Sequence, residues 1–321
     1  MAIFSEARPF LPIDLPLMRR LTAYGVSLDS ATSLTRGIHM MEGAFWSALP
    51  LTDLGTPTLV LRTEDSGYVA QFRHKLNDQH AHIVFIAPDL RNDSDESAWL
   101  ALIDAMVYAA GKRGALTLNA EVDENSDAFV LLRSCGFAVY ARQQIWRLAA
   151  GTVTNTADST TQPTDLLRIE AASDAFSISA LYNSIVPRLV LQADAPPETD
   201  RGLVCEQNGR VNAYFAVQEG RSGVYVQPFL HPEMYDQATA VHRALLAHLP
   251  RAERCPVYVC VRRYQDWLRE PLSELGFEPW SSQAVMVKHT TARIEQPLLR
   301  PIMAFERAVQ VAGPPVRAKI Q

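Results

Sequence analysis

The alternation of apolar and polar positions predicts strands and helices in a fixed order before residue 149. Trp99, Ile103, Met106 and Ala110 recur at helical spacing and predict a helix with one core-facing stripe. Shorter apolar runs bounded by turn residues predict strands. The expected order is strands at 58–62, 68–73 and 81–87, the helix from 97, a strand at 115–122, a short helix at 126–134 and a strand at 137–148.

The same order of elements returns after a polar stretch at 150–164, which is rich in Thr, Ser, Asn and Asp and typical of a linker. Gln207-Asn208-Gly209 is a strong hairpin signal, because both central residues of such a turn favour a left-handed backbone. The second set of expected elements is a strand at 167–171, a helix at 176–186, strands at 202–206, 211–218 and 223–227, a helix at 237–249, a strand at 256–261, a helix at 267–275 and a strand at 279–288.

The two sets can be aligned residue by residue. Gly136-Phe137 and Gly276-Phe277 lie 140 residues apart, and Gln143 and Gln283 keep the same offset. Matching element order on both sides of these residues predicts a tandem duplication. The domains that follow are 1–149, a linker at 150–164, 165–290, and a C-terminal helix and tail at 291–321.

Composition narrows the class of protein. Hydrophobic residues make up 48% and charged residues 20%, as in ordinary globular proteins. A net charge of −5 argues against a nucleic-acid partner, and no apolar run reaches the roughly 20 residues that span a membrane. The start of the chain lacks a basic segment followed by an apolar block, so no signal peptide is predicted. Four scattered cysteines at 135, 205, 255 and 260 predict reduced thiols, no bound metal and a cytoplasmic location.

Three features of the first copy resemble the acetyl-CoA-dependent N-acetyltransferase (GNAT) superfamily. They are the segment from Asn125 to Gly136-Phe137, the strand 83–88 leading to Arg91, and the helix that follows. The resemblance implies an α/β fold in which helices flank a mixed, mainly antiparallel sheet, here in two tandem GNAT-like domains. It also implies acetyl-CoA as co-substrate, bound against Ala87, Arg91 and Asn125, and an unidentified small amine as acceptor.

Both copies depart from the family pattern. The loop that would wrap the cofactor pyrophosphate has no glycine, and Asp93, Asp95 and Glu96 place negative charge at the helix start. Asp93 and Glu96 have the spacing of a capping box. The tyrosine that protonates the departing thiolate in many family members is replaced by Leu132 in the first copy and Leu272 in the second.

His82 is the candidate catalytic base. It lies two residues after His80, so both histidines are expected on one face of the strand that would line the acetyl site. A neutral histidine near its usual pKa of about 6.5 accepts a proton from an ammonium group. The alternative is a solvated strand end or a cross-strand histidine with a structural role.

Two functions follow as hypotheses. The first is an N-acetyltransferase acting on a small amine, with the first copy as the better site because it keeps Arg91 and Asn125. The second is a non-catalytic binding or scaffold protein, motivated by the acidic loop and the two leucines. In either case we expect a monomer or homodimer without membrane or nucleic-acid partners.

Overall fold

A computed structural model describes residues 6–37, 55–63, 66–75, 78–90, 95–152, 166–194, 196–197 and 199–290. The first half of the chain begins with short elements and continues with the strands and helices expected from the sequence. Its elements are β1 (Arg8–Pro9), α1 (Leu15–Leu21), β2 (Val26–Ser27), α2 (Ser30–Arg36), β3 (Thr58–Arg62), β4 (Gly67–Arg73), β5 (His80–Ala87), α4 (Glu96–Lys112), β6 (Thr117–Asp123), α5 (Asp127–Ser134) and β7 (Ala138–Leu148).

The second half repeats the order of the larger elements. Its first strand is shorter than expected, and 3-10 helices (η) precede its last two helices. The elements are β8 (Arg168–Ile169), α6 (Ala175–Ile185), α7 (Arg188–Ala193), β9 (Arg201–Gln207), β10 (Arg210–Glu219), β11 (Val224–Leu230), η6 (Pro232–Gln237), α8 (Ala238–Ala247), β12 (Val257–Arg262), η8 (Arg263–Leu268), α9 (Arg269–Glu274) and β13 (Glu278–His289).

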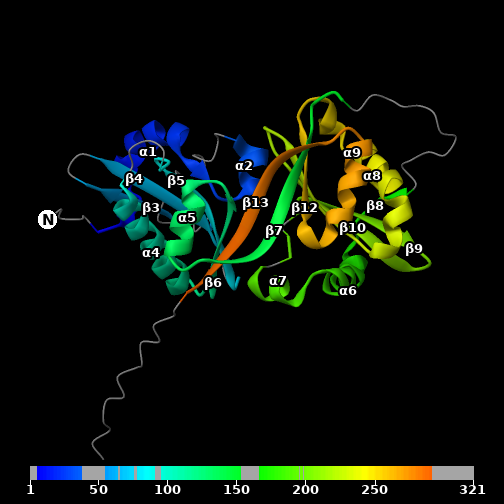
Figure 1. Cartoon of the computed structure of the whole chain (residues 1–321), viewed down its shortest axis with the longest axis horizontal. Coiled ribbons are helices and arrows are strands. Elements are labelled where there is room, and N and C mark those ends of the chain that lie inside the picture. Colours follow the sequence, from blue (N-terminus) through cyan, green and yellow to red (C-terminus); the bar gives the residue numbers. More distant parts are fainter. Residues whose placement is uncertain are drawn as a thin grey trace, which may run out of the picture.

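All the strands of the described residues join one sheet that runs through both halves (Figure 1). The strand order is β1-β3-β4-β5-β6-β13-β7-β12-β11-β10-β9-β8, with β2 paired to β5. The pairs β5–β6 and β11–β12 are parallel, and the others are antiparallel. The mixed, mainly antiparallel α/β class predicted from the sequence is therefore confirmed.

The two halves exchange their last strands. β13, from the second half, lies between β6 and β7 of the first half, and β7 pairs in turn with β12 of the second half. The two strands cross the middle of the molecule side by side (Figure 1). The domain limits at 149 and 165 stay a prediction. The strand pairing shows in addition that each half contributes its last strand to the part of the sheet formed by the other half.

The register of the exchanged strands has a local twofold symmetry. Gln143 and Gln283, matched by the 140-residue offset, are direct partners across the β7–β13 pair, and Gln143 Nε2 donates to Gln283 Oε1 over 2.8 Å. Trp146 pairs with Pro279, and Val139 pairs with Met286. These two pairs lie on opposite sides of the Gln143–Gln283 pair and are equivalent under the 140-residue offset. The offset found in the sequence therefore reappears as a symmetric pairing.

The exchange is also visible in the hydrophobic cores. The stripe predicted from helical spacing forms the buried face of α4 in the first half, where Trp99 and Met106 are fully buried. Met286 of β13 belongs to this core, whereas Trp146 of β7 belongs to the core of the second half. Burial of apolar area thus ties the last strand of each half to the other half.

Local signals in the sequence set the ends of several elements. Asn208 (φ 55°) and Gly209 (φ 74°) have the left-handed backbone that the turn between β9 and β10 requires. The capping expectation at α4 was wrong, because the N-cap is Asp95, whose side chain accepts from the Ser97 N–H over 2.8 Å. Asp93 and the predicted C-terminal helix lie outside the described residues.

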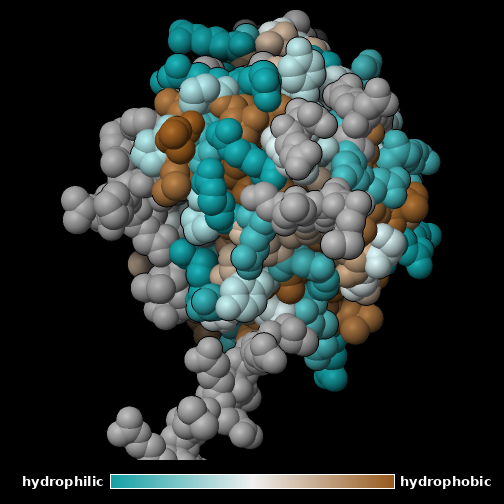
Figure 2. Space-filling view, turned by 90° about the vertical axis from the view of Figure 1, so that its left-hand side faces the viewer, coloured by the Kyte–Doolittle hydropathy of each residue, from teal (hydrophilic) through white to brown (hydrophobic). Residues whose placement is uncertain are grey.

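The surface mixes polar and apolar side chains. On the end of the first half, brown apolar residues lie among teal polar ones (Figure 2). No helix among the described residues has the length and apolar character needed to cross a membrane.

Candidate functional site

The residues predicted to hold acetyl-CoA lie on β5 and in the turn after β6. Ala87 is fully buried at the end of β5. Asn125 is exposed, and its backbone N–H donates to Asp123 Oδ1 over 2.8 Å. Arg91 lies outside the described residues. Ala87 and Asn125 do not line either cavity described below, so their cofactor role stays a prediction.

The edge of β5 that faces away from β4 is covered by the chain's own residues 24–28, called here the 24–28 segment. Within it, β2 pairs antiparallel with residues 85–86 of β5. The Asp89 N–H donates to the Tyr24 carbonyl over 2.6 Å, and the Leu28 N–H donates to the Val84 carbonyl over 2.9 Å. The backbone groups along this edge are therefore bonded within the chain.

Leu28 also fills the gap where β5 and β6 separate. The two strands pair at residues 80–82 and 117–119 and then diverge. Beyond that point the Glu121 N–H donates to the Leu28 carbonyl over 2.8 Å, and the Leu28 residue is only 1% exposed. Gly25 permits this close approach, because a Cβ there would lie 3.0 Å from the Ala87 Cβ.

The second half closes the matching gap with a side chain. β11 and β12 pair at 224–226 and 257–259 and then separate. Gln265 of η8, which is 2% exposed, accepts from the Leu230 N–H over 3.1 Å and donates to the Pro228 carbonyl over 2.8 Å. Its amide group replaces a strand partner at the free edge of β11.

These contacts test whether acetyl-CoA fits the place that the family resemblance implies. In the first half the edge of β5 is occupied, and the helix start after the loop carries the Asp95 carboxylate as its cap. Leu132 and Leu272, at the positions of the expected acid, are both fully buried. The residues present do not fit the cofactor along this path in either half.

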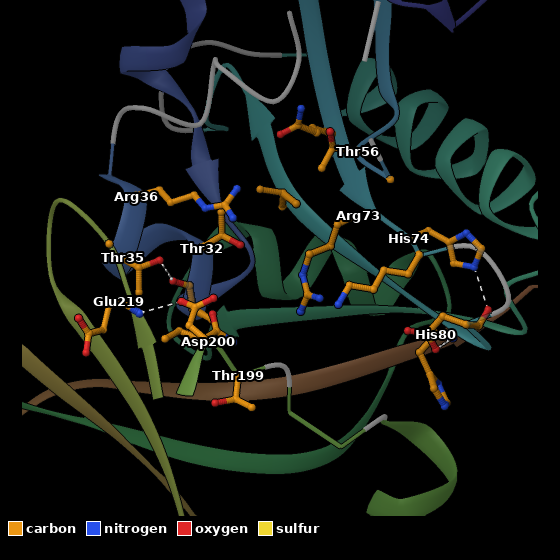
Figure 3. A pocket seen from close by; sticks show the side chains of 18 of the residues that line it. Thr32, Thr35, Arg36, Thr56, Arg73, His74, His80, Thr199, Asp200 and Glu219 are labelled. Carbon is orange, nitrogen blue, oxygen red and sulfur yellow. Dashed lines mark hydrogen bonds between the residues drawn. The ribbon is translucent and has the colours of Figure 1, made fainter. Parts of the chain in front are cut away.

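The structure instead forms a polar cavity at the junction of the halves. Its outer part, the outer cavity, has a volume of about 570 Å³ and is lined by α2, β4, β5 and the loop joining β10 to β11. Arg36 and Arg73 extend toward its centre (Figure 3). The charged residues that line it are Arg36, Arg73, Lys75, Asp78, Asp200, Glu219 and Arg221.

A smaller inner cavity of about 300 Å³ shares Arg73, Lys75, Asp78 and other lining residues with the outer one. Both halves contribute charged side chains to it. The first half gives Asp29, Arg73, Lys75, Asp78, His82 and Glu121, and the second half gives Asp194 and Arg262.

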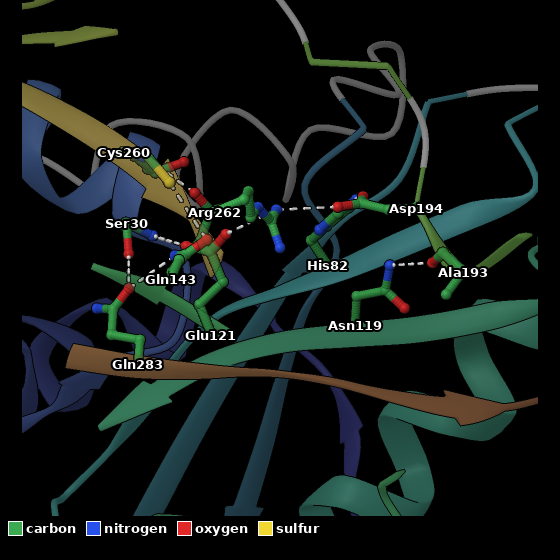
Figure 4. A network of polar contacts seen from close by, with 12 residues as sticks. Ser30, His82, Asn119, Glu121, Gln143, Ala193, Asp194, Cys260, Arg262 and Gln283 are labelled. Carbon is green, nitrogen blue, oxygen red and sulfur yellow. Dashed lines mark hydrogen bonds and ion pairs between the residues drawn. The ribbon is translucent and has the colours of Figure 1, made fainter. Parts of the chain in front are cut away.

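Ion pairs fix the side chains of the inner cavity. Arg73 pairs with Asp29, whose other carboxylate oxygen caps α2 by accepting from the Thr32 N–H. Arg262 Nη2 lies 3.1 Å from Asp194 Oδ2 and 3.9 Å from Glu121 Oε1 (Figure 4). The contact between Arg262 and Glu121 crosses the junction of the halves, and the other two pairs hold charged groups within one half.

Backbone contacts hold the remaining members of the cluster. Asn119 Nδ2 of β6 donates to the Ala193 carbonyl over 2.7 Å, which ties the end of α7 and the adjacent Asp194 to the first half. The Ser30 N–H donates to Glu121 Oε2 over 2.9 Å. Contacts within the chain therefore hold the side chains of the cavity wall in place.

Of the predicted site residues that the structure describes, His82 alone lines the inner cavity. Its side chain is 18% exposed, and Nε2 lies 3.9 Å from Asp194 Oδ1. Burial, and then the positive charge of Arg73, lower the pKa of His82 to about 4, so the ring is neutral at pH 7. Its catalytic role stays a prediction.

The buried carboxyl groups differ in their surroundings. Burial raises the pKa of Glu121, and the nearby Arg262 only partly offsets this effect. Burial also acts to raise the pKa of Asp29, but Arg73, His82 and the Thr32 N–H together outweigh it and the pKa is lowered. The inner cavity thus holds two buried carboxyl groups, Asp29 and Glu121, whose pKa values are shifted in opposite directions.

Most residues of this cluster were missed in the sequence because they come from separate elements. One signal was present, since Glu121 lies within a largely buried strand and Arg262 is the last residue of another. Charged residues at such positions are seldom buried without a partner. Within the described ranges, no three His, Cys, Asp or Glu side chains are grouped as metal ligands.

Comparison with known proteins places the fold. No protein-family model matches the chain, and no curated protein sequence matches it. Among solved structures it is similar to a GCN5-related N-acetyltransferase from Sphaerobacter thermophilus, with a TM-score of 0.56, 12% identity, and coverage of 89% of this chain and 96% of that chain. It is also similar to a tandem GNAT protein from the clavulanic acid biosynthesis pathway, with a TM-score of 0.53, 14% identity, and coverage of 89% and 98%.

The chain therefore has the GNAT fold over most of its length, and the fold expected from the resemblance is confirmed. Sequence identities this low show the fold alone. Function has to be argued from the site.

Proposed function

We propose that this chain is a GNAT-fold protein that binds a small polar molecule in the cavity between its halves, and that it does not bind acetyl-CoA along β5. The observation that carries the proposal is the 24–28 segment. It pairs with the edge of β5 and, through Leu28, bridges β5 to β6.

Displacing this segment has a substantial energetic cost. The Leu28 side chain leaves the core of the first half, and burying a leucine is worth about 1.5–3 kcal/mol. The hydrogen bonds of Leu28 and Glu121 are lost as well, each worth about 1 kcal/mol net. A ligand that replaced the segment would have to recover this free energy before it gained any affinity.

The cavity has unoccupied space between polar side chains, whereas the edge of β5 is covered by the 24–28 segment. Polar residues of both halves line the cavity, and ion pairs such as that of Arg262 with Asp194 hold its charged side chains. A preformed concave site with a few fixed polar groups is the usual form of a small-molecule site. This supports a binding role for the junction.

The test is thermal unfolding with and without millimolar acetyl-CoA or CoA. Ligand at about 100 times its dissociation constant stabilises the folded state by about 2.7 kcal/mol, which raises the melting temperature by several degrees. We expect no rise for either compound. A rise that Asn125→Ala abolishes would contradict the proposal and locate the cofactor where the family resemblance implies.

N-acetyl transfer to a small amine is the second candidate function. It is favoured by the fold shared with a GCN5-related N-acetyltransferase and by the neutral His82 on the cavity wall. A thiol assay for CoA release from acetyl-CoA, run with a panel of amines, distinguishes the two functions. Amine-dependent release would establish this second function, and we expect none.

A further inference from the structure

We propose that the inner cavity binds the carboxylate of an amino-acid-sized molecule, with Nη1 of Arg262 as the main hydrogen-bond donor. This inference rests on the proposed binding function and names its ligand class. It assigns to Arg262 a ligand-binding role beyond its ion pair with Asp194.

Arg262 carries an unused donor on the cavity wall. Its side chain is 9% exposed, and Nη2 is engaged by Asp194 at 3.1 Å. Nη1 is buried and has no hydrogen-bond partner among the described residues. A buried guanidinium nitrogen without an acceptor is unfavourable, so a ligand oxygen there would satisfy it.

The arginine also selects the shape of the ligand group. A guanidinium presents its N–H groups in a planar fork that matches a carboxylate. In Figure 4 the guanidinium of Arg262 reaches toward Asp194, and one of its nitrogens carries no dashed line. Nη2 is kept in place by Asp194, whereas the buried Nη1 has no acceptor among the described residues.

The charge around Arg262 allows an added carboxylate. Asp29 is paired with Arg73, and Asp194 is paired with Arg262, so both carboxylates are already compensated. Burial raises the pKa of Glu121, which lies beside Arg262. Lys75 adds a positive charge to the wall, and Asp78 adds a negative one.

Size limits the ligand. The inner cavity of about 300 Å³ is at the low end of small-molecule sites, which suits a compound of amino-acid size. The outer cavity of about 570 Å³ leaves room for a substituent that extends from it.

The experiment is a ligand-detected NMR screen of amino-acid-sized carboxylic acids, each paired with its uncharged amide, and of small amines. We expect one or more acids to bind the wild-type protein, with each matched amide at least tenfold weaker. Amides that bind as well as their acids, or a screen in which only amines bind, would overturn the carboxylate assignment while leaving the binding function standing. A screen in which no compound of any charge class binds would overturn both.

Variants then test Arg262 itself. Arg262→Lys keeps the positive charge opposite Asp194 but lacks the planar fork and therefore has no donor at the Nη1 position, so we expect acid binding at least tenfold weaker. Arg263→Gln is the control, because Arg263 is adjacent and exposed, and we expect it to bind like the wild type. Unchanged binding by Arg262→Lys would overturn the role of Arg262.

A wild-type measurement keeps the test independent of folding defects in a variant. The side-chain N–H resonances of Arg262 should shift when a bound acid is added and should not shift with its amide. Binding of the acid without any change in these resonances would place the carboxylate elsewhere and overturn the proposal.

Discussion

At the scale of single residues, the groups around His82 determine its protonation state. The sequence places it on the strand that would line an acetyl site, and the structure places it between Arg73, Asp29 and Asp194. Burial and Arg73 favour the neutral ring, so its pKa falls from 6.5 to about 4. A neutral ring carries no charge into the cavity.

This shift predicts a pH dependence of stability. Because the folded-state pKa lies below the unfolded value, the unfolded chain binds a proton first as the pH falls through 6.5. Stability is then lost between pH 6.5 and 4, by up to about 3 kcal/mol from this residue at 1.36 kcal/mol per pKa unit. We expect His82→Gln to remove that part of the loss, measured by urea unfolding over this pH range.

The comparison with the wild type isolates His82, because the other titrating groups are common to both proteins. Parallel curves of unfolding free energy against pH for the two proteins would show that His82 does not carry the shift.

The sequence predicted only part of the cavity at this scale. His82 was singled out because it lies, with His80, on one face of the strand that would line the acetyl site. Arg262 and Asp194 were not found, since their 3.1 Å contact joins positions 68 residues apart. Charge pairs between distant segments leave no local pattern in a single sequence.

An arginine–aspartate pair with a spacing of six residues recurs in the two halves. Arg8 and Asp14 form a two-point contact with distances of 2.7 and 2.9 Å, and Arg168 and Asp174 form one with distances of 2.6 and 2.9 Å. Both aspartates also accept from the backbone N–H three residues earlier. This local likeness between the halves adds to the predicted duplication.

At the scale of elements, periodicity and turn chemistry gave most of the helices and strands. The α4 stripe and the Asn208-Gly209 turn were read correctly because they depend on nearby residues. The strand exchange was not predicted. An alternating strand shows which face it buries, but it does not show which neighbour it pairs with.

The exchange predicts that the halves do not fold well alone. Without β13, a chain ending at residue 149 exposes the edge of β6 and loses Met286 from its core. We expect residues 1–149 expressed alone to aggregate or to lack a cooperative melt, and to associate stably when co-expressed with residues 165–321. Circular dichroism and size-exclusion chromatography would follow both outcomes.

The opposite result is also informative. A soluble, cooperatively melting 1–149 fragment would show that β7 can take the place of β13 beside β6. The exchange would then be dispensable for folding of the first half.

At the scale of the whole molecule, the two halves line one cavity region together while each closes its own sheet gap. The first half uses Leu28 and the second half uses Gln265 for that closure. Both halves contribute to the charged wall of this cavity, because Arg262 Nη2 of the second half lies 3.9 Å from Glu121 Oε1 of the first half. The cavity is not lined by Ala87 or Asn125, the described residues at which the family resemblance implies the cofactor.

Amide hydrogen exchange at Leu28 and Glu121 tests this account most directly. Both N–H groups are bonded in the closure of the gap between β5 and β6, to Val84 and to Leu28 respectively. We predict exchange as slow as that of the core strands, with rates unchanged by millimolar acetyl-CoA. Fast exchange at these two amides, or a change in their protection when acetyl-CoA is added, would contradict the claim that the chain itself occupies the cofactor path.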